Sequence, residues 1–462
     1  MKVRNYQELS SHGDVEPRKT VLELMEATLE ALDAYPLIKH LLKLEGDILR
    51  IGDSRWDLRQ KRHVFVVGAG KACNAMARAV EEILGDRIEK GIVIVKQKEP
   101  GDELYRIELV KGGHPLPGRD GFQGTQRILS LVDESHPDDL FIGLISGGSS
   151  ALMSCPVPGI SLDDEIQVTD QLLKSGARIL EINAVRRHIS QTNGGRLAER
   201  IEARGAEMIN LIISDSVGDK PTLHPEKPAL FFGTPVAPDG TTVQDARKVL
   251  RKYALLSRAP RSIIEFLQVE APSRETPKRF GQRIHQFVLE GCADSCEVAK
   301  KIIKEKGQAG LVLTTFLEGE SREAGTFLAS VVREILFNRR PSAPPCFVMA
   351  SGETTTKVEG SSGRGGPSQE LALSFALEAW RLTGTVLIAM DTDGTDGPTD
   401  VAGGIVDSAT VERARQMGLD PIGYLYGHDS ATFLQHLGDQ VLTGNTGTNV
   451  CDFNVMYIRG NR

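Results

Sequence analysis

Residues 64–72 read Val-Phe-Val-Val-Gly-Ala-Gly-Lys-Ala, an apolar run that ends in a Gly-Ala-Gly turn. Such a run is typical of a strand buried on both faces, here turning through Gly68 and Gly70 into a helix. A helix N-terminus after a tight glycine turn favours an anion, and Lys71 adds a positive charge. Because Cys73 replaces the third glycine of a dinucleotide fingerprint, the motif alone fits an anion site or a close-packed turn equally well.

The same rhythm of strand and helix recurs along the chain. Apolar runs that predict further buried strands in the first half occupy residues 92–95, 140–145 and 209–213. The corresponding runs in the second half occupy residues 311–313, 347–349 and 386–390. Short apolar runs alternating with helical patterns are typical of parallel strands covered by helices on both faces. We therefore expect a doubly wound α/β fold with ligands beyond the carboxyl ends of the strands.

The pattern predicts two domains. Residues 1–290 form the first, with a Rossmann-like doubly wound parallel sheet, and residues 291–462 form a second α/β domain. Residues 219–283 hold many prolines and little strand pattern, so we expect this segment to be irregular.

Composition and charge exclude several classes of protein. The chain has 462 residues and a formal net charge of −7, which gives no electrostatic footprint for nucleic acid. Its 47 glycines exceed the average share, and many gather in clusters at predicted strand ends. The six cysteines are scattered, and no apolar run reaches membrane-spanning length. We expect a cytoplasmic protein that binds neither nucleic acid nor a membrane.

Two further glycine loops belong to the first domain. Residues 112–118 read Gly-Gly-His-Pro-Leu-Pro-Gly, where His114 either contacts substrate or is satisfied within a rigid loop. Residues 146–150 read Ser-Gly-Gly-Ser-Ser, which suits phosphate because backbone N–H groups and hydroxyls both bind its oxygens. The candidate phosphate-binding residues of this loop are Ser146, Gly147, Gly148, Ser149 and Ser150.

Charged side chains follow other predicted strands. Asp215 stands at a strand tip in the first domain, and Glu353 follows a strand of the second. Arg364 lies between glycines a short span after Glu353. Glycine beside arginine allows the guanidinium and the backbone to approach a carboxylate or phosphate together.

The last two polar loops are the densest. Residues 391–400 carry four aspartates after a predicted strand, and Asp391 and Asp393 suit Mg²⁺ or ribose hydroxyls. Residues 443–449 form a small, polar loop that suits a nucleotide or phosphate. The candidate binding residues of this loop are Thr446, Thr448 and Asn449. Glycine loops, a lysine, an arginine and clustered carboxylates are together the parts of a phosphoryl-transfer site.

The order of these motifs resembles one family. The motifs Gly-Ala-Gly-Lys-Ala, Gly-Gly-His-Pro, Ser-Gly-Gly-Ser-Ser, Gly-Glu-Thr-Thr, Gly-Arg-Gly-Gly and Asp-Thr-Asp-Gly occur here in this order. The set is similar to the glycerate 2-kinase family, the class II glycerate kinases (DUF4147/MOFRL), with a MOFRL region at about residues 345–458. The resemblance implies a two-domain enzyme with its active site in the inter-domain cleft. It also implies ATP- and Mg²⁺-dependent phosphorylation of D-glycerate at the 2-hydroxyl, giving 2-phosphoglycerate and ADP.

The resemblance further implies residue roles. Lys71 falls on a family lysine that reaches substrate or phosphate, and Asp215, Glu353 and Arg364 fall on acidic and basic site residues. We expect Lys71 and Arg364 to neutralise the glycerate carboxylate and the transferring phosphoryl group. We expect Asp215 to accept the proton of the 2-hydroxyl. The expected substrate- and ATP-binding residues are Gly68, Gly70, His114, Ser146–Ser150, Thr446, Thr448 and Asn449.

Magnesium is expected at the carboxylates of the second domain. Glu353, Asp391 and Asp393 are the candidate ligands, directly or through water.

The chain departs from the family pattern at several positions. Pro367-Ser368 stand where the family usually carries Arg-Asn, and Asn454 replaces an arginine. Asn445 replaces a proline, and residues 220–232 form a longer segment than usual. These changes bear on acceptor choice, so a kinase for a related small hydroxy acid is an alternative.

Two other functions also fit parts of the pattern. A hydroxypyruvate reductase would need a nicotinamide site, and Cys73 in place of a third glycine argues against one. A non-catalytic regulator that binds sugar phosphates gains nothing from the carboxylates of residues 391–400. A homodimer is a further expectation.

Overall fold

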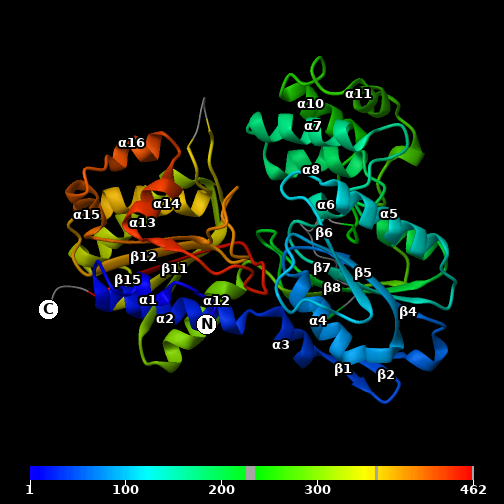
Figure 1. Ribbon diagram of the computed structural model, residues 1–462, viewed down its shortest axis with the longest axis horizontal. Helices are drawn as coiled ribbons and strands as arrows, with labels where there is room; N and C mark the ends of the chain where they lie inside the picture. The colour runs from blue at the N-terminus through cyan, green and yellow to red at the C-terminus, as the bar shows by residue number, and fades with distance from the viewer. Residues whose placement is uncertain (225–234, 359–362, 460–462) are drawn as a thin grey trace. The chain divides into compact units, whose positions relative to one another are not determined.

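The computed structural model describes residues 1–224, 235–358 and 363–459 (Figure 1). The chain divides into two compact units. The parallel-sheet unit comprises residues 34–214 and 221–289, and the mixed-sheet unit comprises residues 1–33, 215–220 and 290–462.

Six strands form the sheet of the parallel-sheet unit. Their order is β6 (Ile107–Lys111), β5 (Ile88–Val95), β4 (Val64–Ala69), β7 (Leu140–Ile145), β8 (Glu207–Ile213) and β9 (Ile284–Glu290). The pairings from β6 through β8 are parallel. All six residues of β4 and all six of β7 are buried, as expected of strands covered on both faces. The predicted doubly wound sheet is confirmed.

Helices cover both faces of this sheet (Figure 1). The apolar cluster on one face joins α5 (Arg119–Asp133) and α9 (Arg196–Ala203) to side chains of β4, β7 and β8. On the other face lies α4 (Cys73–Leu84), which follows the Gly68–Gly70 turn and contacts α3 (Ala34–Leu41). A small antiparallel sheet of β1 (Leu42–Glu45), β2 (Ile48–Ile51) and β3 (Ser54–Asp57) follows α3.

Four helices form a separate layer in the same unit. They are α7 (Leu162–Lys174), α8 (Ile179–His188), α10 (Val243–Lys252) and α11 (Arg261–Gln268), and they share one apolar cluster. The expectation that residues 219–283 are irregular is therefore wrong for α10 and α11. Thr242 and Asp245 form a capping box that starts α10, and the prolines in the described part of this segment lie outside both helices. Residues 225–234, which hold most of the segment expected to be long, lie outside the described residues.

The mixed-sheet unit also has six strands. Their order is β10 (Ala309–Glu320), β11 (Cys346–Thr355), β15 (Asp452–Ile458), β12 (Thr385–Asp391), β13 (Gly403–Asp407) and β14 (Gln440–Val441). Only β10 and β11 pair in parallel, and every other pairing is antiparallel. The predicted strands at 311–313, 347–349 and 386–390 lie within β10, β11 and β12.

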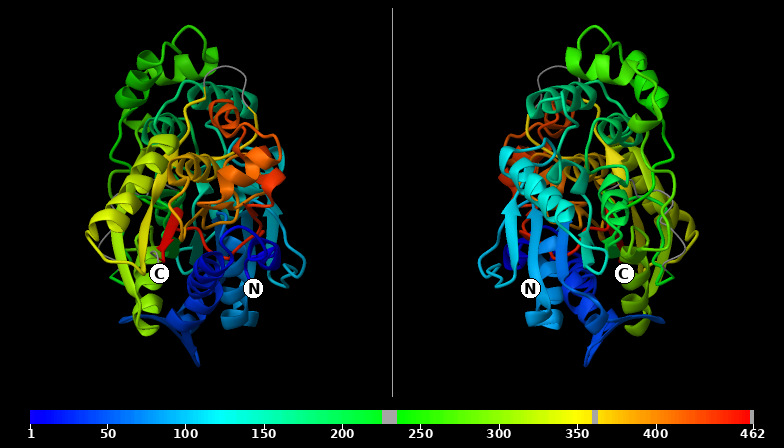
Figure 2. Two further views of the ribbon diagram at one scale, coloured as in Figure 1. Left: turned by 90° about the vertical axis from the view of Figure 1, so that its left-hand side faces the viewer. Right: turned by 90° about the vertical axis from the view of Figure 1, so that its right-hand side faces the viewer.

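Helices also cover both faces of the mixed sheet (Figures 1 and 2). On one face pack α13 (Ser321–Asn338), α14 (Pro367–Ala379), α15 (Thr410–Gln416), α16 (Pro421–Tyr426) and α17 (Ser430–Leu437). On the other pack α2 (Val15–Ala31) and α12 (Asp294–Glu305). Because Leu22, Met25 and Leu29 of α2 are fully buried in the cluster of this sheet, residues 1–33 belong to the mixed-sheet unit. The sequence groups these residues with the N-terminal domain.

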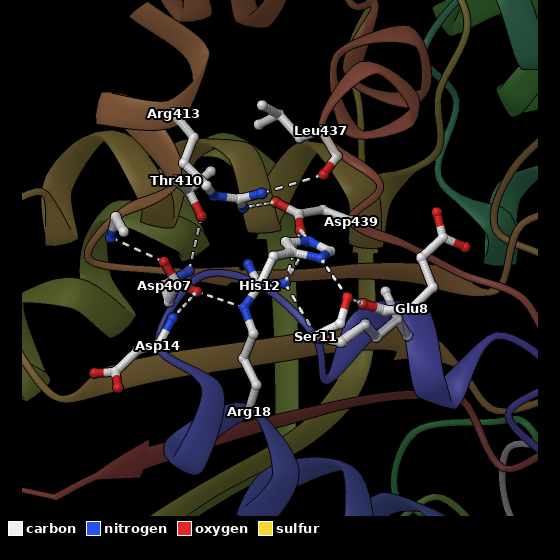
Figure 3. Close-up of polar contacts among 12 residues, drawn as sticks. Glu8, Ser11, His12, Asp14, Arg18, Asp407, Thr410, Arg413, Leu437 and Asp439 are labelled. Carbon is white, nitrogen blue, oxygen red and sulfur yellow. Dashed lines mark hydrogen bonds and ion pairs between the residues drawn. The ribbon is translucent and has the colours of Figure 1, made fainter. Parts of the chain in front are cut away.

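A buried ion-pair network fastens the N-terminal segment to this unit (Figure 3). The Arg18 guanidinium pairs with Asp407 at the end of β13, and its Nη1 lies 2.7 Å from Asp439 Oδ1. Asp439 also accepts hydrogen bonds from His12 at 2.9 Å and from Arg413 at 2.5 Å. Burial lowers the pKa of Arg18, but the charges of Asp439 and Asp407 outweigh burial and raise it. The network holds the turn before α2 against the ends of β13 and α17.

Candidate active site

The glycines of the first predicted loop are required by close packing. A Cβ atom on Gly68 would lie 2.1 Å from the carbonyl oxygen of Leu144, and one on Gly70 would lie 2.0 Å from Ser146 Oγ. Both contacts are between the ends of the neighbouring strands β4 and β7. Of the two readings of this motif, these distances favour the close-packed turn.

Ser146 joins the same two strand ends. Its buried hydroxyl accepts a hydrogen bond from the N–H of Ala72, the residue before α4, at 3.0 Å. The N–H of Lys71 donates to the carbonyl of Gly147 at 3.0 Å. Two backbone N–H groups at the start of α4 are thus bonded to the 146–150 loop, and the hydroxyl of Ser146 has a structural role.

Gly148 brings two candidate side chains together. Its φ is +83°, which only glycine adopts without strain. A Cβ atom here would lie 3.1 Å from the His114 ring and 3.2 Å from Lys71 Cγ. The loops after β4, β6 and β7 therefore meet at the carboxyl end of the parallel sheet, the place where ligands bind in doubly wound folds. Ser149 is buried beside them, and the carbonyl of Ser150 accepts a hydrogen bond from Asn193 at 3.1 Å.

Asn193 is a residue that the sequence reading missed. Its side chain is fully buried and holds the backbone of the 146–150 loop. It precedes Gly194 and Gly195, both at positive φ. The Asn-Gly-Gly sequence at residues 193–195, between two helices, is the sequence feature that could have identified this residue.

In the mixed-sheet unit, carboxylates converge on the start of β15. Asp452 pairs with Gly352 on one side and with Asp391 on the other, so it lies between the ends of β11 and β12. Glu353 follows Gly352 directly. Burial, together with the charges of Asp391, Asp396 and Glu353, raises the pKa of Asp452 well above its usual range. Sequence reading missed Asp452 because its strand was not predicted.

The aspartates of residues 391–400 do different things. Asp393 accepts hydrogen bonds from the N–H and hydroxyl of Thr395 at 2.7 and 2.5 Å. Asp396 is buried and accepts the N–H groups of Ser368 and Gln369 at 3.0 and 2.8 Å, so it caps α14. Among the described residues, no group of three or more His, Cys, Asp or Glu side chains is arranged to hold a metal ion. Magnesium at Glu353, Asp391 and Asp393 stays a prediction.

The 443–449 loop lies against these groups. The Thr446 hydroxyl donates to the carbonyl of Thr392, and the Thr448 hydroxyl to Glu290 at 3.4 Å. The Asn449 amide donates to Asp215 Oδ2 at 3.4 Å, which places the predicted proton acceptor beside this loop. Cys451, whose thiol donates to the carbonyl of Asp215 at 2.9 Å, holds the same segment.

Arg364 has an exposed side chain and a fixed backbone. Its N–H donates to Asp429 at 2.8 Å, and its carbonyl accepts from Ala431 at 2.9 Å. The neighbouring glycines are packed: Cβ atoms on Gly365 and Gly366 would lie 2.3 Å from Ser430 Oγ and 2.3 Å from Asp396 Cγ. Side chains of the protein itself therefore occupy the space beside these glycines, and the approach of Arg364 to a carboxylate or phosphate stays a prediction.

The departure at Pro367-Ser368 has a local explanation. Pro367 is the first residue of α14, where a missing N–H costs no hydrogen bond. The N–H of Ser368 is bonded to Asp396. Pro367 and Ser368 thus form the start of α14. Further along this helix, Glu370 accepts a hydrogen bond from His428 at 2.9 Å.

Comparison with known proteins defines the class. The domain of unknown function DUF4147 matches residues 20–268, and the MOFRL family matches residues 346–452. The chain therefore belongs to the glycerate 2-kinase family, in which a DUF4147 domain precedes a MOFRL domain.

Individual relatives match over nearly their whole length. The glycerate 2-kinase of Pyrococcus horikoshii is 38% identical over 96% of this chain and 98% of its own. The D-glycerate 2-kinase of Thermotoga maritima is 38% identical over 94% of this chain and 97% of its own. A crystal structure of glycerate kinase from Thermotoga maritima superposes with a TM-score of 0.74 at 36% identity, covering 95% of this chain and 99% of that one.

Proposed function

We propose that the protein transfers the γ-phosphoryl group of ATP to the 2-hydroxyl of D-glycerate, forming 2-phosphoglycerate and ADP. The observation that carries this proposal is the match, over nearly the whole chain, to proteins named glycerate 2-kinase. The charges of the two units support it. Lys71 and His114 flank Gly148 in one unit, and Asp215, Glu353, Asp391 and Asp452 gather in the other.

Phosphoryl transfer depends on positioning and charge neutralisation, and these groups supply both. Lys71 and Arg364 neutralise the carboxylate of glycerate and the transferring phosphoryl group. Asp215 accepts the hydroxyl proton, with its carboxylate oriented by the amide of Asn449. His114 donates a hydrogen bond to a substrate oxygen. The 146–150 and 443–449 loops bind the phosphates or the substrate through backbone N–H groups and hydroxyls.

The chemistry of the mixed-sheet carboxylates fits a magnesium ion. Mg²⁺ prefers oxygen ligands and keeps several waters, so one or two of Glu353, Asp391 and Asp393 would suffice to hold it. Burial, followed by the charges of Asp391, Asp396 and Glu353, raises the pKa of the neighbouring Asp452, and a cation would offset the part that comes from these charges. When bound, the ion neutralises the charge that develops on the phosphates.

The proposal is tested by incubating the purified protein with ATP, Mg²⁺ and a panel of small hydroxy acids. We expect ADP release with D-glycerate and phosphate on its second carbon, identified by ³¹P NMR. ADP release with a related hydroxy acid but not with D-glycerate would show that the related acid is the phosphoryl acceptor. Oxidation of NAD(P)H with hydroxypyruvate, without ATP turnover, would establish a reductase. Tight phosphate-ligand binding without any ADP release would establish a regulator.

We also propose a cytoplasmic homodimer. All six cysteines are free thiols, as suits a reducing compartment. No helix among the described residues is long and apolar enough to cross a membrane.

The strand β10 lies at one end of its sheet, and its Phe316 is 59% exposed. Pairing of β10 between two copies would cover this edge, and sedimentation equilibrium would give the mass.

A further inference from the structure

The first residues of the chain run beside the 443–449 loop. We call residues 2–5 the N-terminal strap. The N–H of Arg4 donates to the carbonyl of Leu442 at 2.7 Å. The side chain of Asn5 accepts from the N–H of Leu442 at 3.0 Å and donates to the carbonyl of Gln440 at 2.8 Å. Because β14 is the last strand of its sheet, the strap covers an edge whose backbone groups would otherwise need water.

Lys2 ties the strap to the loop itself. Its ammonium lies 2.6 Å from the carbonyl of Thr446 and 2.5 Å from Asp33 Oδ2. Asp33 also lies against the loop, since a Cβ atom on Gly447 would be 2.9 Å from its carboxylate. The side chain of Lys2 is 22% exposed, so this ion pair is better shielded than a surface pair. One ammonium thus fixes the backbone of a residue predicted to bind phosphate or substrate.

The position of Lys2 is set independently of the loop. Val3 is fully buried in the apolar cluster that contains α2. The carboxylate of Glu26, on α2, accepts the N–H groups of Lys2 and of Val3, the latter at 2.9 Å. The strap is therefore anchored on α2, which the Arg18 network in turn fastens to the sheet (Figure 3).

The other side of the loop contacts the candidate site. Thr446 donates to the carbonyl of Thr392, and two residues later Thr448 donates to Glu290. Asn449 donates to the carboxylate of Asp215 at 3.4 Å. A shift of the backbone at Thr446 would therefore move the amide that orients the proposed proton acceptor.

We propose that Lys2 is a positioning residue for phosphoryl transfer, acting through Thr446 to hold Asn449 beside Asp215. This role rests on the glycerate 2-kinase function proposed above. In the proposed mechanism, other residues than Lys2 contact D-glycerate and ATP. Loss of Lys2 therefore lowers kcat more than it raises the KM of D-glycerate. An arginine at position 2 keeps a cation that can bond to both oxygens, so it restores most of the function.

The test compares Lys2→Met, Lys2→Arg and Lys300→Met, which removes an exposed lysine of α12 in the same unit. Hydrogen exchange of residues 440–449 reports the loop, and steady-state kinetics report catalysis. In Lys2→Met we expect faster exchange in the loop and a kcat lowered about 10- to 100-fold, as misplacement of reacting groups produces. Lys2→Arg and Lys300→Met should stay within about 3-fold of wild type, well below the loss expected in Lys2→Met.

The outcomes separate the two proposals. Unchanged exchange in Lys2→Met, faster exchange with an unchanged kcat, or an equal loss in Lys300→Met would each overturn the positioning role. Asp33→Asn provides a second variant on the same contact, and a kcat equal to wild type in it would also count against the role. A wild-type protein that phosphorylates no hydroxy acid would overturn the proposed function itself.

Discussion

Lys71 and Arg364 are the two cations assigned to the reacting groups. Lys71→Ala and Arg364→Ala should each lower kcat/KM for D-glycerate by on the order of 10²–10³, because each removes charge that stabilises the transition state. Lys90→Ala, an exposed lysine on β5, is the matched control and should leave kcat/KM unchanged. Near-wild-type rates in both site variants, with circular dichroism showing an intact fold, would remove the charge assignment.

Glu207 gives a pH-dependent contribution to stability. Burial raises its pKa, but hydrogen bonds from His285, Lys61 and Trp56 outweigh burial and lower the pKa to about 2. The three donors lie at 2.7, 2.6 and 2.8 Å. Because the folded pKa is below the unfolded value, the stabilisation is complete above about pH 4.5 and is lost as the pH falls towards 2.

Glu207→Gln should therefore lower the free energy of unfolding at pH 7 by about 1–2 kcal/mol, a figure discounted for partial exposure. Between about pH 4.5 and 2 the difference from wild type should shrink, because the wild-type carboxylate becomes protonated. Urea unfolding at several pH values measures both effects. Glu199→Gln, at an exposed position of α9, is the control. A difference that does not change with pH would contradict the assigned pKa.

At the scale of elements, the Arg18 network decides where α2 packs. Arg18→Met would leave Asp407 and Asp439 buried without their main cation, so we expect the mixed-sheet unit to lose about 3–5 kcal/mol of stability. The neighbouring Lys19 pairs with Glu16 at the surface, so Lys19→Met should change stability by less than about 0.5 kcal/mol. Thermal unfolding followed by calorimetry compares the two. Equal stabilities would show that apolar packing alone holds α2.

Sequence patterns located some elements and missed others for physical reasons. Strands such as β4 and β7 were predictable because burial on both faces makes them continuous apolar runs. In β15, Asp452 and Asn454 interrupt the apolar pattern, and its partners β11 and β12 are distant in sequence. The carboxylates around Asp452 therefore could not be assembled from the sequence, although Glu353 and Asp391 were each identified.

Glycine clusters show the same limit at the candidate site. The sequence indicates where glycine is needed but not what approaches it. At Gly68 and Gly366 the approaching group is the protein itself, a carbonyl of β7 and the carboxylate of Asp396. At Gly148 it is a pair of site side chains, His114 and Lys71. Only long-range packing distinguishes these cases, because all three glycines belong to glycine-rich motifs in the sequence.

At the scale of the whole molecule, the mixed-sheet unit is built from both ends of the described chain. Its N-terminal helix α2 and its central strand β15 are separated in sequence by the entire parallel-sheet unit. During synthesis, α2 leaves the ribosome first and β15 is the last strand to follow. The parallel-sheet unit can fold on the nascent chain in the meantime. Until β15 is inserted, β11 and β12 have no strand to join them and α2 has an apolar face without its sheet. During this interval the apolar surfaces of α2, β11 and β12 are exposed, which favours aggregation, and a chain that stops before residue 452 lacks the strand that joins β11 to β12.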